Sequence, residues 1–305
     1  MFFKKQSPTS LKTYTCLTKE EINTLQLKAK ASQSSFYESL RSSNENMTGN
    51  LKSNIKGAGI DFEENKPYQA GADSRHINWR TFARTGDLYV NIYNEDKRPS
   101  TYLVLDQRLN MYFGTRKQLK IKQALKFSTY AILKALYQQQ AVSGVQISDI
   151  PTWHNKYNSE NSILGFIDSI NQPPKNLLKN NNNNEPALND ILNKLQLKPG
   201  SELIIISDLH DINQQTTTIL HNLSQHYKIS IVHIQDPIET NLPSKGLFSI
   251  RNNPSSQLLE LNCYNNIMTS QYEERVLEKF KQHIDNFQQM GINVLQCTTL
   301  DKGIE

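Results

Sequence analysis

The chain has 305 residues, which is enough for one large domain or two modest ones, each with its own core. Hydrophobic residues make up 37% and charged residues 21% of the chain, a balance that is typical of a globular protein. The net charge of +5 is mildly basic and is spread along the chain, so it argues against nucleic acid as a partner.

The three cysteines, Cys16, Cys263 and Cys297, form no C-x-x-C pair. An odd number without that spacing argues against a disulfide framework or a zinc site and favours a reducing compartment. No apolar run approaches the roughly 20 residues that cross a bilayer. The first residues have no signal-peptide core. We therefore expect a cytoplasmic protein with no membrane span.

Residues 1–55 predict an N-terminal helix followed by a polar loop. Thr18 and Glu21 have the spacing of a capping box, which opens a helix. Residues 56–98 are dense in charged and aromatic side chains and contain short extended pieces. In residues 88–93, apolar and polar positions alternate, as in a strand.

From residue 99 onward, short apolar runs alternate with longer amphipathic stretches. Four buried strands are predicted over 101–106, 202–207, 228–234 and 292–297, with extended pieces near 247–251 and 258–261. Helices are predicted over 117–140, 159–171, 186–197, 214–226 and 269–289, and the Asn-rich residues 172–186 predict a loop. This alternation predicts an α/β domain over 99–305, with a mainly parallel sheet flanked by helices.

Two aspartates, Asp106 and Asp208, each follow an apolar strand that precedes a helix. Ligands of parallel α/β sheets bind at the carboxyl ends of the strands, where two carboxylates could hold a cation such as Mg²⁺. Each aspartate could equally cap the loop or helix that follows it. The sequence leaves both interpretations open.

The residues after Asp106 resemble an altered von Willebrand A-type metal site, whose first strand ends in D-x-S-x-S. Here the corresponding residues are Asp106, Arg108 and Asn110. Asn110 could supply an oxygen, but Arg108 brings a fixed positive charge in place of a hydroxyl ligand. We therefore hypothesise that Arg108 pairs with Asp106 or Asp208 in place of a metal, so that Mg²⁺ is disfavoured and no cofactor is expected.

The stretch from Gly59 to Val90 interleaves arginines and acids with aromatic residues. Alternation over residues 76–80 predicts a short extended piece with one polar and one apolar face. Mixed charges of this kind form either an internal salt-bridge network or a recognition surface. The partner-binding candidates are Asp73, Arg75, Trp79, Arg80 and Arg84.

Enzyme signatures are missing from the sequence. It has no G-x-S-x-G elbow, P-loop, H-E-x-x-H motif or dinucleotide-binding glycine pattern. Asp208, His210 and Asp211 could belong to a phosphoesterase-like hydrolase, but no second histidine motif accompanies them. We therefore expect no enzymatic activity.

Together these motifs resemble the bacterial family called domain of unknown function fifty-eight, from about Lys56 to the C-terminus. The positions that match its hallmark are Gly59, Asp61, Phe62, Tyr68, Gly71, Asp73, Arg75, Ile77, Trp79, Ala83, Arg84, Leu88 and Val90. The chain departs from that hallmark at Lys66, Ala72 and Asn78. Two later stretches, residues 206–211 and Asp236–Gly246, resemble the family's later segments.

The resemblance implies a von Willebrand factor A-like fold and a working context with MoxR-type AAA+ ATPases, which assist the assembly, maturation or stress tolerance of other proteins. Our first interpretation is therefore a protein-binding adaptor or scaffold, with such an ATPase and a client protein as its partners. The alternatives are a metal-dependent adhesion-type binder using Asp106, Asn110 and Asp208, and the phosphoesterase-like hydrolase.

Overall fold

The computed structural model describes residues 14–32, 34, 36–43, 64–67, 79–92, 100–174, 185–250, 259–264, 266–301 and 304. By its contacts the chain divides into two compact units, one made of residues 1–51 with 99–305 and the other of residues 52–98. The N-terminal helices therefore belong to the same unit as the α/β sheet.

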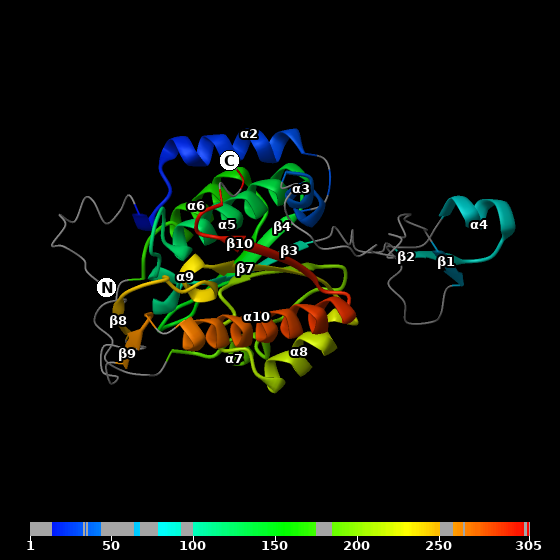
Figure 1. Cartoon of the computed structure of the whole chain (residues 1–305). Helices are drawn as coiled ribbons and strands as arrows, with labels where there is room; N and C mark the ends of the chain where they lie inside the picture. The colour runs from blue at the N-terminus through cyan, green and yellow to red at the C-terminus, as the bar shows by residue number, and fades with distance from the viewer. Residues whose placement is uncertain are drawn as a thin grey trace. The chain divides into compact units, whose positions relative to one another are not determined.

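The larger unit is built on a six-stranded sheet with the order β10-β7-β6-β3-β4-β5 (Figure 1). Five strands run parallel and the edge strand β5 is antiparallel to β4. Their bounds are β3 Ser100–Asp106, β4 Ala141–Ile147, β5 Thr152–Tyr157, β6 Glu202–Ser207, β7 Lys228–Gln235 and β10 Asn293–Thr298. The predicted mainly parallel α/β sheet is confirmed, and it is consistent with a von Willebrand A-like or Rossmann-like fold.

Helices cover both faces of this sheet (Figure 1). One face is covered by α5 (Lys120–Tyr137) and α6 (Glu160–Ile170), and side chains of α2 (Lys19–Ala31) and α3 (Phe36–Ser43) join the same buried cluster. The other packs against α7 (Leu188–Leu192), α8 (Gln214–Ser224) and α10 (Asn266–Gln289). Side chains alternate between these layers, since Leu103 and Leu105 face the first layer and Val104 faces the second.

Helix α5 lies at the centre of the first layer and is buried almost all round, since only three of its eighteen residues are not buried. Ile121, Leu125, Ser128, Ile132 and Leu136 recur at the spacing of one helix face, and the first four of them are buried. A helix that packs on several sides has to bury polar residues too, and Lys120, Lys126 and Lys134 are each at most 4% exposed.

Strands β4 and β5 escaped the sequence analysis. In β4, Ser143 and Gly144 interrupt the apolar run, yet the strand is buried. A Cβ on Gly144 would lie 2.6 Å from the backbone oxygen of Leu103 in β3. Glycine is therefore required here by the close approach of two backbones.

Several predicted helices are shorter in the structure. Helix α7 ends at Leu192, well before the predicted residue 197. A 3-10 helix, η2 (Leu109–Tyr112), follows β3, and a short α9 (Pro237–Thr240) follows β7. A two-stranded ribbon, β8 (Leu247–Ile250) with β9 (Leu259–Asn262), lies between α9 and α10 in the chain.

The smaller unit contains an antiparallel pair, β1 (Glu64–Pro67) with β2 (Tyr89–Ile92), and the helix α4 (Trp79–Thr85). The expected extended piece over residues 76–80 is wrong at Trp79 and Arg80, which begin α4, while residues 76–78 lie outside the described residues. The alternation that predicted it covers five residues, too few to separate a strand from a helical turn.

Candidate functional site at the strand ends

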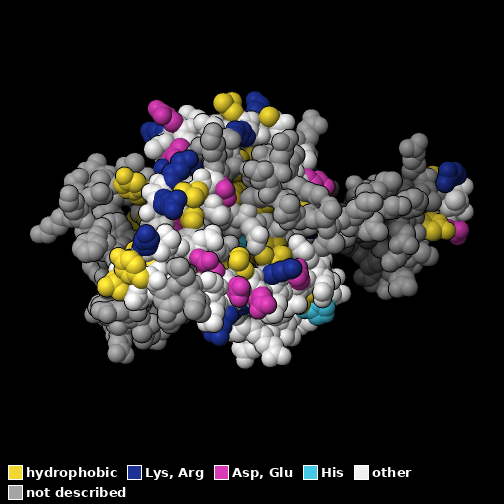
Figure 2. Space-filling model, viewed as in Figure 1, with side chains coloured by type: hydrophobic (Ala, Val, Ile, Leu, Met, Phe, Trp, Pro, Cys, Tyr) yellow, Lys and Arg dark blue, Asp and Glu magenta, His cyan; other side chains and the backbone are white. Residues whose placement is uncertain are grey.

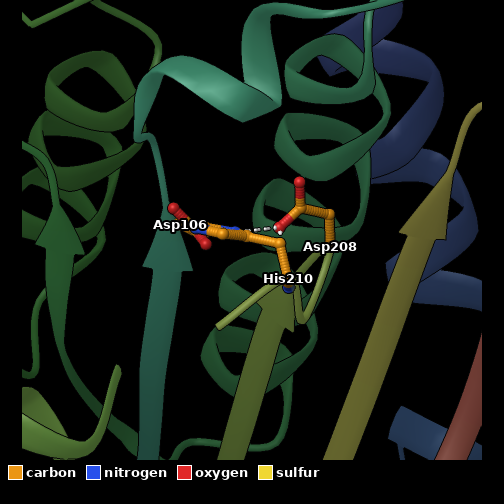
Figure 3. Close-up of side chains that lie close together, drawn as sticks. All are labelled: Asp106, Asp208 and His210. Atoms are coloured by element: carbon orange, nitrogen blue, oxygen red, sulfur yellow. Dashed lines mark hydrogen bonds and ion pairs between the residues drawn. The ribbon is translucent and has the colours of Figure 1, made fainter. Parts of the chain in front are cut away.

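Asp106 and Asp208 lie close together at the carboxyl ends of the neighbouring strands β3 and β6 (Figure 3). One carboxylate oxygen of each aspartate and one ring nitrogen of His210 lie within 4.8 Å of one another. The two carboxylates therefore meet at one edge of the sheet. We call Asp106, Arg108, Lys120, Asp208, His210, Asp211 and Glu239 the strand-end rim.

Arg108 binds Asp106 through both arms of its guanidinium group. Its Nε donates to Asp106 Oδ1 at 3.0 Å and its Nη2 to Oδ2 at 2.7 Å. Both side chains are buried, at 2% and 1% exposure. The same carboxylate also accepts from the hydroxyl of Ser207 at 2.7 Å. Asp106 is thus held by a bidentate cation and a neutral donor inside the protein.

The guanidinium of Arg108 also reaches Asp211, on the loop after β6. Nη1 donates to Asp211 Oδ2 at 2.5 Å and Nη2 to Oδ1 at 3.1 Å. Asp211 further accepts from the backbone N–H of Leu188, at the start of α7. Arg108 therefore pairs with Asp106, as hypothesised, but its second partner is Asp211 rather than Asp208.

Asp208 has a cation of its own, Lys120 at the start of α5. The Lys120 Nζ donates to Asp208 Oδ2 and to Glu239 Oε1, both at 2.7 Å. The Lys120 side chain is 2% exposed and that of Asp208 is 5% exposed, whereas Glu239 on α9 is half-buried. A second buried ion pair thus lies beside the first.

His210 forms the most exposed part of the rim, with 34% of its side chain exposed. Its Nδ1 lies 2.7 Å from Asp208 Oδ1, the contact drawn as a dashed line in Figure 3. Between them in the chain, Leu209 has φ 55°, in the left-handed region that bulky residues rarely adopt. The loop therefore holds Asp208 and His210 in a strained, fixed turn.

The ion pairs shift the pKa values of the rim. Burial alone would lower the pKa of Arg108 and of Lys120, but the neighbouring carboxylates hold both above their usual values. Burial would raise the pKa of Asp208 and Asp211, but their hydrogen bonds and the nearby cations hold both below the usual range. Arg108, Lys120, Asp208 and Asp211 are therefore ionised at neutral pH.

Asp236, which follows β7, lies beside the rim and ties three loops together. Its carboxylate accepts from the backbone N–H and hydroxyl of Thr115, from the hydroxyl of Thr299 and from the N–H of Ile238. The side chain is completely buried. The loops after β3, β7 and β10 are thereby fastened to one carboxylate.

A divalent cation fits this donor set poorly. The oxygens of Asp106 that would bind a metal accept hydrogen bonds from Arg108 and Ser207, and those of Asp208 accept from Lys120 and His210. A metal would have to displace two buried cations that already satisfy the same negative charge. Asn110, the third expected ligand position, lies in η2 and is half-buried.

Sequence reasoning missed Lys120, Ser207 and Glu239. In the sequence, nothing distinguishes Lys120 from the other polar residues of its helix, and it lies 88 positions from Asp208, whose carboxylate it binds. The one available signal was its place just after the loop that follows β3, since such loops meet the strand ends.

The partner-binding candidates lie in or near the smaller unit. Trp79 is 63% exposed and contacts Phe82 edge-on, with ring centroids 6.1 Å apart. Arg84 is exposed on the same helix, α4, which also contains Arg80. Asp73 and Arg75 lie outside the described residues. The structure thus shows an exposed aromatic pair at this place, and the role of the five residues stays a prediction.

Among the described residues on the face shown in Figure 2, charged side chains of both signs are interspersed. No helix among the residues that the structure describes is long and apolar enough to cross a membrane.

Comparisons with known proteins give a family but no activity. The family described as "Protein of unknown function DUF58" matches residues 64–282. Uncharacterized proteins of Mycobacterium tuberculosis and Mycobacterium bovis are 23% identical over 201 residues, covering 63% of this chain. The match spans 60% of the length of these relatives.

Among solved structures, the chain is similar to the conserved hypothetical protein BatB of Bacteroides thetaiotaomicron, with 11% identity and a TM-score of 0.42, over 68% of this chain and 93% of that one. An aerotolerance-related membrane protein of Bacteroides fragilis matches at 10% identity, with the same TM-score and coverage.

Proposed function

The chain belongs to the DUF58 family of proteins of unknown function, and we propose that it is a non-enzymatic adaptor that binds a protein partner at the strand-end rim without a metal ion. The observation that carries this proposal is the pair of buried cations, Arg108 and Lys120, each bridging two carboxylates. They supply from within the chain the positive charge that a metal supplies in a metal-dependent binding site.

The geometry of the rim supports binding more than catalysis. The acids of the rim are already paired, so none of them is left as a general base. Asp211, which a hydrolase would use beside His210, is bound by Arg108 and by the N–H of Leu188. What the rim offers a partner is a fixed pattern of charge with His210 at its most exposed point.

The partner that the family resemblance implies is a MoxR-type AAA+ ATPase, and the client is a protein whose assembly or maturation it assists. This remains a proposal about a working context. The exposed aromatic pair Trp79 and Phe82 on α4 is a second candidate contact surface for the same partners, since exposed tryptophan is enriched among the residues that dominate interfaces.

An affinity pull-down from the native organism, with and without ATP, tests the proposal. His210→Ala changes the exposed edge of the rim, and His221→Ala on α8, also an exposed histidine, is its matched control. We expect His210→Ala to reduce partner capture and His221→Ala to leave it unchanged, and we expect the same results when EDTA is present. If EDTA by itself abolished partner capture by the unaltered chain, binding at the rim would depend on a metal and the proposal would be contradicted.

A metal-dependent adhesion-type site is the second candidate, favoured by the three potential ligands within 4.8 Å. Calorimetric titration with Mg²⁺ or Mn²⁺ separates the two. Micromolar binding that disappears in Asp106→Ala would establish the metal site and overturn the first proposal.

A further inference from the structure

The helices α2 and α3 form an arm, and α2 packs along α5 (Figure 1). Four apolar side chains of this arm join the core cluster of α5: Leu25, Ala29, Phe36 and Leu40. Asn171, at the end of α6, exchanges two hydrogen bonds with the backbone of Leu17, just before α2. The arm is thus a third layer on top of the helix that covers the sheet.

The surface of α5 under the arm carries a stripe of lysines. Lys122, Lys126, Tyr130 and Lys134 are spaced four residues apart and therefore lie on one side of the helix. Lys126 and Lys134 are 4% and 1% exposed, and the side chain of Lys122 is 13% exposed. We call these four residues the lysine stripe. The arm hides it from solvent.

Helix α2 meets this stripe with a matching row of its own. Glu21, Leu25 and Ala29 are also spaced four residues apart. Glu21 Oε1 lies 2.9 Å from Lys122 Nζ, and Ser32 Oγ at the end of α2 accepts from Lys134 Nζ at 2.9 Å. The two helices therefore run parallel, with an acid at one end of the contact and a neutral hydroxyl at the other.

The two ends of the contact differ in how well the lysine is compensated. Burial would raise the pKa of Glu21, but its bond from the N–H of Thr18 and the charges of Lys122 and Lys126 hold it below the usual value. At the other end, burial lowers the pKa of Lys134 despite the opposing charges of Glu202 and Glu38.

The Lys134 ammonium contacts the Ser32 hydroxyl and lies 5.7 Å from the centroid of the Tyr130 ring. Transferring an ammonium group from water to a site where a hydroxyl and an aromatic ring replace its water molecules is unfavourable. Closure of the arm is therefore favoured at Glu21 and opposed at Lys134.

We propose that the arm is an exchangeable cover, and that the lysine stripe, once uncovered, binds a helix of a protein partner that has an acidic residue followed by apolar residues four and eight positions later. The helix that now occupies the stripe defines this chemistry, because α2 meets it with Glu21, Leu25 and Ala29. The acid complements the lysines, and the apolar residues join the same buried cluster as Tyr130. This surface is separate from the strand-end rim and does not depend on the function proposed for it.

Hydrogen exchange of the full chain, measured by mass spectrometry on peptides from α2 and from β6, tests whether the cover opens. Two substitutions of the same kind on the stripe should act in opposite directions. Lys134→Met removes the poorly compensated ammonium and should slow exchange in α2 about tenfold. Lys122→Met removes the ion pair to Glu21 and should speed exchange several-fold, with β6 unchanged in both variants. Exchange of α2 at the same rate as β6, or a change of the same sign in both variants, would overturn the cover.

Binding is tested with a fluorescent peptide of residues 17–34 added to the full chain. Glu21→Gln in the chain loosens its own arm but leaves the stripe intact, so it should bind the peptide at least about tenfold more tightly than the unaltered chain does. A peptide carrying Leu25→Asp should not bind. Absence of peptide binding to the Glu21→Gln chain would overturn the proposal. Dimerisation of the Glu21→Gln chain in the absence of peptide would also overturn the proposal, because the arm of a second copy would then be the occupant of the lysine stripe.

Discussion

Replacing Arg108 by serine tests the central feature of the strand-end rim. The change removes the bidentate partner of Asp106 and leaves that carboxylate with Ser207 and the backbone N–H of residue 108. Because Asp106 is 1% exposed, water cannot take over the role of the guanidinium. Breaking a buried pair from one side costs about 3–5 kcal/mol. We expect the free energy of unfolding to fall by that amount.

Urea denaturation measures this loss. With a denaturant slope near 3 kcal/mol per M, the midpoint should fall by about 1–2 M. Lys228→Ser is the control, since Lys228 is 42% exposed and lies 3.7 Å from Glu202, and an exposed pair of this kind contributes less than about 1 kcal/mol. Asp106→Asn combined with Arg108→Ser should be less destabilised than the sum of the two single changes.

Magnesium provides the refuting result. Arg108→Ser restores a hydroxyl between Asp106 and Asn110, but Asp208 remains paired with Lys120. A concentration of about 10 mM Mg²⁺ is ample for a functional site. We therefore expect it to leave the urea midpoint of the variant unchanged. Full rescue by Mg²⁺, or a loss of stability below about 1 kcal/mol, would show that the cations do not hold the rim in the way described.

Three further changes probe other parts of the chain. His233 on β7 is 1% exposed, and burial lowers its pKa to about 4, so the unfolded chain takes up the proton first as the pH falls. The stability that is present above pH 6.5 should therefore decrease by roughly 3 kcal/mol between pH 6.5 and 4. Urea titrations at each pH should show this decrease as a difference between the wild type and His233→Phe, which cannot bind the proton. Gly144→Ala should lower the melting temperature strongly or prevent folding, because the new Cβ would lie 2.6 Å from the Leu103 oxygen, whereas Gly165→Ala on α6, where nothing lies within 4 Å, should leave it unchanged or raised. Trp79→Ala with Arg80→Ala should abolish partner capture in a pull-down at an almost unchanged melting temperature, and a large drop in that temperature would instead indicate that the segment stabilises the fold.

Strand and helix order could be predicted where apolar periodicity was strong. Strands β3 and β6 contain the apolar runs Tyr102–Leu105 and Leu203–Ile206, and β7 is apolar apart from Ser230 and His233 in its interior; both faces of these strands are buried, and the sequence placed all three. Strand β4 could not be found in the same way, because Gly144 is there for contact with β3 and carries no apolar signal. The short edge strand β5 has mostly exposed side chains, so burial imposed no pattern on it.

The candidate site shows the same division between local and distant contacts. The pairing of Asp106 with Arg108 could be anticipated, since the two residues are neighbours at a strand end. The pairing of Asp208 with Lys120, and of Arg108 with Asp211, joins residues about 90 to 100 positions apart, which only the folded sheet brings together. A single sequence gives no signal for contacts of that range.

The buried carboxylate of Asp236 has a consequence for association. Because Thr115, Ile238 and Thr299 all donate to it, the loops that border the strand ends are already set in place before anything binds. Docking against a surface prepared in this way needs little additional ordering of the chain, so a modest contact area suffices for useful affinity. The same rigidity makes the surface selective, since it cannot reshape itself around an ill-fitting neighbour.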